Sequence, residues 1–283
     1  MLRVCSFESR RAAEMRSLIE RHGGRATIAP SLQEIPIEDN AVALAFGEQL
    51  GRGEIDLVVF LTGVGAQGLL DVLTTRHSME ELQTWFGRTT VIVRGPKPVA
   101  ILRQAGLRVD YRAAEPNTWR EVIELLDNTP IPVAGQIVAV QEYGQPQDEL
   151  TQALRNRLAT VIPVPVYQWA LPDDIGPLEQ SIHSTIAGEF DVLLFTSAQQ
   201  AVNVLEVADR LGVKENWLAA ARKCVLGSIG PTATETLDKL GLPPDVEPTH
   251  GKMGHLVIET LAFANEALLT AEDSSAPVRT TQP

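Results

Sequence analysis

GEIDLVVF at 53–60 and GEFDVLLF at 188–195 are near copies of one another, 135 positions apart. The same offset continues past these segments and matches Gly95 with Gly230 and Asp110 with Asp245. An offset held over about 60 residues indicates that one structural unit occurs twice in the chain. Each copy contains a short, continuously apolar run, which is typical of a strand buried on both faces of a parallel sheet.

Short apolar runs alternate with helical patterns along the rest of the chain, from RVCSF at 3–7 to HLVIETLAFA at 255–264. Such alternation predicts βαβ units, and therefore an α/β fold with parallel sheets. The strand, helix and strand of residues 1–30 recur in 137–163, so one unit need not be contiguous. We expect two similar parallel-sheet α/β lobes, the second inserted into the first and joined to it by a two-strand hinge beside a cleft.

The predicted boundaries place lobe 1 at 1–36 plus 171–265 and the inserted lobe 2 at 37–170. Residues 266–283 show no apolar periodicity and are expected to form a disordered tail.

Composition excludes several classes of function. The 24 Lys and Arg against 36 Asp and Glu give a net charge of −12, which argues against binding to nucleic acid or to anionic membranes. No apolar run approaches the roughly 20 residues of a spanning helix. Cys5 and Cys224 lie in apolar stretches without a signal-peptide pattern upstream, so we expect a reduced, cytoplasmic protein. His250 and His255 lack further ligands at metal-binding spacing, and no metal is expected.

Polar and glycine residues follow directly on several predicted strands. Ser197 follows DVLLF and Thr232 follows VLGSI; their counterparts in the other copy are Thr62-Gly63 and the segment 94–97, Arg-Gly-Pro-Lys. Open α/β sheets bind ligands at the carboxyl ends of their strands, where helix N-termini offer N–H groups and a positive dipole end. Several such N-termini predict a polycarboxylate ligand. Alternatively, Ser197 and Thr232 only cap their own helices.

The run GVGAQG at 63–68 matches the glycine fingerprint of dinucleotide-binding turns. That fingerprint needs an acid at the end of the next strand, where this chain has Arg94, which would suit a 2′-phosphate. An NADP-linked oxidoreductase therefore stays open as an alternative, although the other copy reads TSAQQ and has no such glycines. No GxSxG, Walker A or CxxC motif supports hydrolase, NTPase or thiol-redox chemistry.

Four segments resemble the uroporphyrinogen-III synthase family: ESRRAAEM at 8–15 after the first strand, PVPVYQW at 163–169, FTSAQQAV at 195–202 and SIGPTATETLDKLGL at 228–242. The resemblance covers essentially residues 2–262, with TGVG at 62–65 and RGPKP at 94–98 typical of a divergent branch. It implies a cofactor-free lyase of tetrapyrrole, porphyrin and haem biosynthesis. The enzyme would cyclise hydroxymethylbilane, which carries eight carboxylates, to uroporphyrinogen III with ring D inverted. A non-catalytic tetrapyrrole-binding protein is the other alternative.

The resemblance also implies roles for individual residues. Tyr167 matches the family's cleft tyrosine, a candidate proton donor that could instead be a packing residue of the hinge. Ser9 and Arg10 stand where the family has a Thr-Arg pair. The remaining substrate-binding candidates offer hydroxyl, backbone or cationic groups: Thr62, Gly63, Arg94, Lys97, Thr196, Ser197, Gly230 and Thr232.

The chain departs from the family at three places: Ala233 replaces a second threonine, QEYG at 141–144 replaces a glycine-rich turn, and Pro96-Lys97-Pro98 occupies what is usually a small polar loop. We expect a monomer that receives its substrate by transient handover from hydroxymethylbilane synthase and needs no cofactor.

Overall fold

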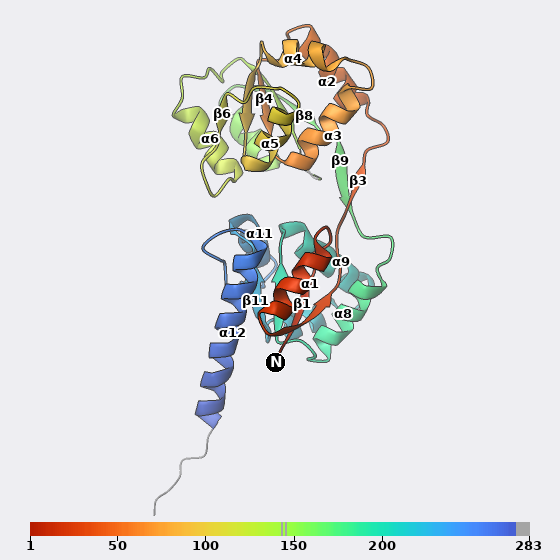
Figure 1. Cartoon of the computed structure of the whole chain (residues 1–283), viewed down its shortest axis with the longest axis vertical. Helices are drawn as coiled ribbons and strands as arrows, with labels where there is room; N and C mark the ends of the chain where they lie inside the picture. Colours follow the sequence, from red (N-terminus) through yellow and green to blue (C-terminus); the bar gives the residue numbers. More distant parts are fainter. Residues whose placement is uncertain (143, 145, 276–283) are drawn as a thin grey trace, which may run out of the picture. The chain divides into compact units, whose positions relative to one another are not determined.

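A computed structural model describes residues 1–142, 144 and 146–275, and divides the chain into two compact units (Figure 1). Lobe 1 comprises Met1–Gln33 and Leu171–Pro283, and lobe 2 is Glu34–Ala170. The chain thus leaves lobe 1 three residues earlier than the predicted end at 36. Two connecting strands, β3 (Gln33–Pro36) and β9 (Tyr167–Ala170), pair with each other in a two-stranded sheet.

Lobe 1 contains a parallel sheet of order β11-β10-β1-β2. The strands are β1 (Leu2–Ser6), β2 (Gly24–Ile28), β10 (Val192–Phe195) and β11 (Val225–Ser228). The helices are α1 (Ala12–Arg21), α8 (Gly176–Ile186), α9 (Ala198–Arg210), α10 (Lys214–Ala221), α11 (Pro231–Lys239) and α12 (Met253–Ser275).

Successive residues of these strands enter two different cores, because side chains of a strand alternate between faces. Cys5 and Leu193 pack with helices α8 to α11 on one face, and Val4 and Leu194 pack with α1 and α12 on the other (Figure 1). Both faces of the sheet are therefore covered, as the continuously apolar runs predicted.

Lobe 2 contains a five-stranded parallel sheet of order β6-β5-β4-β7-β8. The strands are β4 (Leu57–Phe60), β5 (Thr90–Val93), β6 (Tyr111–Arg112), β7 (Ile137–Gln141) and β8 (Thr160–Val164). The helices are α2 (Ala41–Gly51), α3 (Gly63–Leu73), α4 (Met79–Phe86), α5 (Pro96–Gln104), α6 (Trp119–Asp127) and α7 (Asp148–Arg155). Helices α2 to α5 cover one face, and α6 and α7 cover the other. These two sheets confirm the predicted fold class.

The internal repeat is exact for two pairs of strands. The bounds of β4 and β10, and those of β5 and β11, differ by the offset of 135. In both lobes an aspartate accepts a hydrogen bond 2.8 Å long from a strand N–H: Asp110 from Val91 and Asp245 from Leu226. With β7 and β8 as the counterparts of β1 and β2, four strands follow the same spatial order in both sheets, and β6 is an additional edge strand of lobe 2. The chain visits the equivalent strands in a different sequence.

A second pair of equivalent aspartates differs in its surroundings. Asp56 accepts the N–H of Ile137 and Asp191 accepts the N–H of Arg3, each at 2.7 Å. Only in lobe 1 does the strand residue also bring a guanidinium, whose Nη2 lies 2.6 Å from Asp191 Oδ1. The hydrogen bond from Arg3 holds the pKa of Asp191 below its ordinary value.

The C-terminal region differs from the expectation of disorder after 265. Helix α12 continues to Ser275, in a stretch rich in the strong helix formers Ala, Leu and Glu. Residues 276–283 of the predicted tail lie outside the described residues. None of the helices in the described residues combines the length and apolarity that spanning a bilayer requires.

We predict that Asp191→Asn lowers the free energy of unfolding by about 1 kcal/mol at neutral pH, because the backbone N–H and the guanidinium of Arg3 lose a charged acceptor. A lowered pKa means that the stabilisation is present above the ordinary carboxyl pKa and is lost as the pH falls through the lowered value. Urea unfolding from neutral pH to below about pH 4 measures this. Asp56→Asn is the equivalent change at a position without an arginine, and it should lower the free energy of unfolding by less. If the stability difference between Asp191→Asn and the parent protein did not change with pH, this account would be contradicted.

Candidate functional site

The carboxyl ends of the strands in lobe 1 bring three polar segments to one edge of the sheet. Residues 8–10 follow β1, Thr196 and Ser197 follow β10, and Gly230 and Thr232 follow β11. Parallel pairing of β1, β10 and β11 places these segments side by side. All six of the residues predicted for this lobe therefore lie at the same sheet edge.

Two helices begin at this edge without a side-chain cap among the described residues. Helix α9 follows Ser197 and α11 follows Gly230, and neither N-cap side chain bonds to its helix. The Ser197 hydroxyl is buried and has no hydrogen-bond partner within the part of the chain that the structure describes. First-turn N–H groups lack acceptors inside their helix, so these N-termini can receive the acceptors of an anionic ligand.

Other helices show that the chain can close an N-terminus when its sequence provides the residues. Capping boxes of Ser78 with Glu81 and of Thr118 with Glu121 close α4 and α6. Helices α9 and α11 lack such a side-chain cap, as does α5 in lobe 2.

A buried glutamate serves the first helix of this edge. Glu8 lies two residues after the end of β1, and its carboxylate accepts the backbone N–H of Arg11 at 2.9 Å, at the start of α1. The Thr196 hydroxyl donates to the same carboxylate. The Thr196 N–H donates to Gln200 Oε1 at 2.8 Å, so both donors of Thr196 are engaged inside lobe 1. This distinguishes Thr196 from Ser197, although the sequence motif presents the two together.

The other predicted residues of lobe 1 differ in exposure. The Ser9 hydroxyl is half-buried and accepts the N–H of Leu32 at 3.1 Å. Arg10 is exposed just before α1, and Thr232 is exposed in the first turn of α11.

In lobe 2, a hydroxyl pair lies at the carboxyl end of β4. Thr62 is the N-cap of α3, and its hydroxyl accepts the N–H of Gly65 at 3.0 Å. The Tyr167 hydroxyl lies 3.3 Å from Thr62 Oγ1, and Tyr167 is only 7% exposed. The Thr62 N–H in turn donates to Gln141 Oε1 at 3.3 Å.

The cationic segment 94–97 directly follows the neighbouring strand β5. Arg94 is half-buried directly after β5, and Lys97 is exposed in the first turn of α5. The N-cap of α5 is Gly95, which provides no side chain to close the helix. Lys97 adds positive charge to an end of the helix that already favours anions.

Two of the three glycines of GVGAQG, Gly63 and Gly65, are closely packed inside lobe 2. A Cβ on Gly65 would lie 1.8 Å from Gln141 Nε2, and a Cβ on Gly63 would lie 3.2 Å from the backbone of Lys97. In a dinucleotide fold the second glycine of the motif lets the pyrophosphate approach the backbone. Here the fully buried side chain of Gln141 fills that space, which argues against the dinucleotide interpretation.

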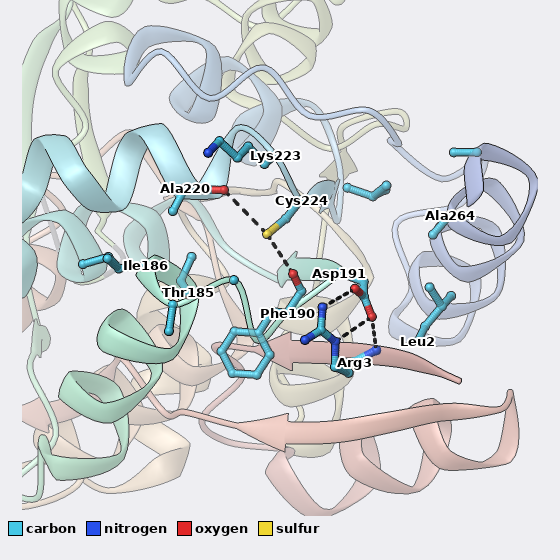
Figure 2. A pocket seen from close by; sticks show the side chains of 14 residues that line it. Leu2, Arg3, Thr185, Ile186, Phe190, Asp191, Ala220, Lys223, Cys224 and Ala264 are labelled. Carbon is cyan, nitrogen blue, oxygen red and sulfur yellow. Dashed lines mark hydrogen bonds and ion pairs between the residues drawn. The ribbon is translucent and has the colours of Figure 1, made fainter. Parts of the chain in front are cut away.

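A cavity with a volume of about 560 Å³ lies at the opposite, amino edge of the lobe 1 sheet. Figure 2 shows the Arg3–Asp191 ion pair and the Cys224 thiol on its wall. Burial, with a smaller effect of Asp191, raises the pKa of Cys224 to about 11, and burial also raises the pKa of Cys5. Both cysteines are free thiols and poor nucleophiles at neutral pH.

A family model described as uroporphyrinogen-III synthase HemD matches residues 13–258. The chain belongs to the uroporphyrinogen-III synthase family. The protein YjjA of Bacillus subtilis (strain 168), described as uncharacterized, is 25% identical over 93% of this chain and 96% of its own length. A putative uroporphyrinogen-III synthase of Methanothermobacter thermautotrophicus is 27% identical over 82% of this chain and 87% of its own.

The fold is also that of solved members of the family. A crystal structure of a mutant uroporphyrinogen III synthase from the extremely thermophilic bacterium Thermus thermophilus matches 95% of this chain and 100% of its own, with a TM-score of 0.70 and 21% identity. The roles that the resemblance to uroporphyrinogen-III synthases implies for Tyr167 and the substrate-binding candidates stay predictions.

Sequence reasoning did not assign a role to three buried residues of these sheet edges. Glu142 follows β7 as Glu8 follows β1, and its carboxylate accepts the N–H of Gln147, the N-cap of α7, at 3.2 Å. Burial raises the pKa of Glu142 above the ordinary value. Gln141 is the third residue, beside Glu8 and Glu142. The equivalence of positions 7–8 with positions 141–142 is the signal that could have drawn attention to them. Tyr143 of the predicted QEYG segment lies outside the described residues.

We predict that Gly65→Ala destabilises the protein by about 1–3 kcal/mol, because the new methyl overlaps a side chain that is itself buried on all sides. Gly68→Ala is the matched control, since its Cβ would meet Val166 at an ordinary 3.5 Å. The control should be neutral or stabilising, because alanine is the better helix former. Urea unfolding measures both, and Gly65→Ala combined with Gln141→Ala should recover part of the loss; equal stability of the two glycine variants would refute the packing account.

Proposed function

We propose that this protein is a uroporphyrinogen-III synthase, a cofactor-independent lyase that dehydrates and cyclises hydroxymethylbilane with inversion of ring D. The observation that carries the proposal is the set of helix N-termini without side-chain caps, α9 and α11 in lobe 1 and α5 in lobe 2, at the carboxyl edges of the sheets. The substrate has eight carboxylates, and hydrogen bonds to carboxylates are among the stronger ones that N–H groups make.

Backbone donors explain how a chain of net charge −12 can bind a polyanion. Peptide N–H groups and helix dipoles act over short distances at the helix end, and they add no formal charge to the protein. Ser197 contributes a buried hydroxyl, and Arg94 and Lys97 contribute local positive charge. The overall acidity keeps other anions away without preventing this local recognition.

The reaction requires a proton transfer to the leaving hydroxyl, a sequence of carbon–carbon rearrangements, and the return of a proton at the end. A phenol with an ordinary pKa near 10 is protonated at neutral pH, so Tyr167 can donate its proton to the leaving hydroxyl. The C–O bond breaks with its electron pair going to oxygen, water leaves, and a cationic azafulvenium forms on ring A. Ring D attacks through its substituted carbon to give a spiro intermediate, which fragments and recloses with ring D inverted. The proton lost when the last pyrrole regains aromaticity returns to the phenolate.

Selection of this product is mainly a conformational task. Hydroxymethylbilane closes spontaneously to the uninverted type I isomer, so the protein must hold the flexible chain where the harder attack is faster. We also propose that the protein works as a cytoplasmic monomer and receives the bilane by transient handover from hydroxymethylbilane synthase.

A coupled assay tests the function. Hydroxymethylbilane is generated in situ, products are oxidised to porphyrins, and the two isomers are separated by chromatography. We expect the type III isomer in proportion to added protein and without any cofactor. Type I isomer alone would refute the proposal. Porphyrinogen binding without turnover would then indicate a binding protein, and a change in NADPH fluorescence would indicate an oxidoreductase.

We expect Tyr167→Phe to lower kcat for type III formation by about 100-fold, at the lower end of the effects of general acids. The spontaneous type I isomer should rise in the same samples, because unconverted bilane accumulates. Tyr111→Phe, in strand β6 of the same lobe, is the control and should leave the rate unchanged. If Tyr167→Phe left the rate of type III formation unchanged, Tyr167 would be a packing residue and not the proton donor.

A further inference from the structure

We propose that Thr62 is a positioning residue that donates its hydroxyl proton to the phenol oxygen of Tyr167 and thereby directs the Tyr167 proton away from α3. The inference deepens the proposed function and rests on it for its catalytic meaning. Its structural basis is the contact of 3.3 Å between the two hydroxyl oxygens, in which either atom could be the donor.

The hydrogen bonds of Thr62 favour one direction of donation. A hydroxyl group has one proton and two acceptor positions. The Gly65 N–H, in the first turn of α3, occupies one acceptor position at 3.0 Å. If Thr62 donates, Tyr167 is the acceptor of its proton within the described residues. If Tyr167 donates instead, the Thr62 hydroxyl accepts two hydrogen bonds and donates none within the described residues. An oxygen that already accepts a hydrogen bond is also the better donor, because hydrogen bonds in a chain polarise one another.

Thr62 is also held in place through its backbone. Its N–H donates to Gln141 Oε1 at 3.3 Å, and the Gln141 side chain occupies the space that a Cβ on Gly65 would need. Gln141 is fully buried, so it cannot move away without disrupting the core of lobe 2. Gln141 thus fixes the Thr62 backbone, and Thr62 fixes the phenol.

Donation by Thr62 has a chemical consequence for Tyr167. A hydrogen bond to the phenol oxygen stabilises the phenolate more than the phenol, which makes the group a stronger acid. The positive end of α3 acts in the same direction. In the proposed reaction the Tyr167 O–H bond breaks, its proton goes to the leaving hydroxyl, and the phenolate formed keeps the Thr62 hydrogen bond until it is reprotonated.

The test compares Thr62→Val, which removes the hydroxyl at nearly constant volume, with Thr62→Ser, which keeps it. The first measurement is absorbance titration of tyrosine ionisation in the resting protein, where Tyr167→Phe identifies the Tyr167 signal among the three tyrosines. We expect Thr62→Val to move the Tyr167 midpoint up by about one pH unit and Thr62→Ser to leave it in place. Thr118→Val removes the N-cap hydroxyl of α6 and reports the effect of losing a cap alone.

The second measurement is the rate of type III isomer formation. Thr62→Val should lower kcat about 10-fold with little change in KM, and Thr62→Ser should restore it. An unchanged Tyr167 midpoint in Thr62→Val would overturn the inference even if the protein is an active synthase. A shifted midpoint in a protein that forms no type III isomer would overturn the proposed function and leave the hydroxyl pair standing.

Folding of each variant is checked by thermal melting. Should Thr62→Val fail to fold, Thr62→Cys replaces it, since its thiol fits the same space and is a weak donor. The same rise of the Tyr167 midpoint is then expected, and its absence would again refute the inference.

Discussion

Parallel pairing of strands concentrates unsatisfied backbone donors at one edge of each sheet. Each helix that follows a strand of the two large parallel sheets starts at the carboxyl edge, and the N–H groups of its first turn have no acceptor within the helix. The fold of each lobe therefore creates the same problem at several adjacent positions. The identity of the residues after β1, β4, β5, β7, β10 and β11 decides whether the protein or a ligand supplies the missing acceptors.

The two lobes use different glutamines at the start of equivalent helices: one accepts the N–H of Thr196, just before the N-cap of α9, and the other accepts the N–H of Thr62, the N-cap of α3. In lobe 1, Gln200 on α9 accepts the N–H of Thr196, and its counterpart in lobe 2 at the offset of 135 is Gly65. In lobe 2, the amide comes instead from Gln141 at the end of β7 and fills the space above Gly65. Two large side chains would not fit there together, so the glutamine on the strand and the glycine on the helix depend on each other.

Sequence reasoning predicted the features that repeat and failed for those that depend on contacts between distant segments. The offset of 135 was sufficient for the fold class, because apolar runs and strand ends are local properties of the chain. The roles of Glu8 and Gln141 were not visible, since each depends on a partner from another strand–helix turn. For the same reason, the sequence predicted the same role for Thr196 and Ser197. The structure separates them: the hydroxyl of Thr196 donates to Glu8, and that of Ser197 has no partner within the described residues. The prediction ended helix α12 at 265, ten residues too early, because the polar, alanine-containing stretch after 265 lacks the apolar stripe by which helical periodicity is recognised.

The insertion of lobe 2 between β2 and β10 has a consequence for biosynthesis. Strand β1 pairs with β10 through residues such as Val4 and Val192, whereas all five strands of the lobe 2 sheet come from one continuous segment. At translation rates of about 5–20 residues per second, β1 emerges roughly 10–40 seconds before its central partner exists. Lobe 2 can complete its hydrophobic core on the ribosome during that interval. Strands β1 and β2 cannot yet form the complete lobe 1 sheet, because β10 has not been synthesised. The first segment synthesised thus belongs to the last lobe to close, and its exposed apolar strands are where chaperones would act on the nascent chain.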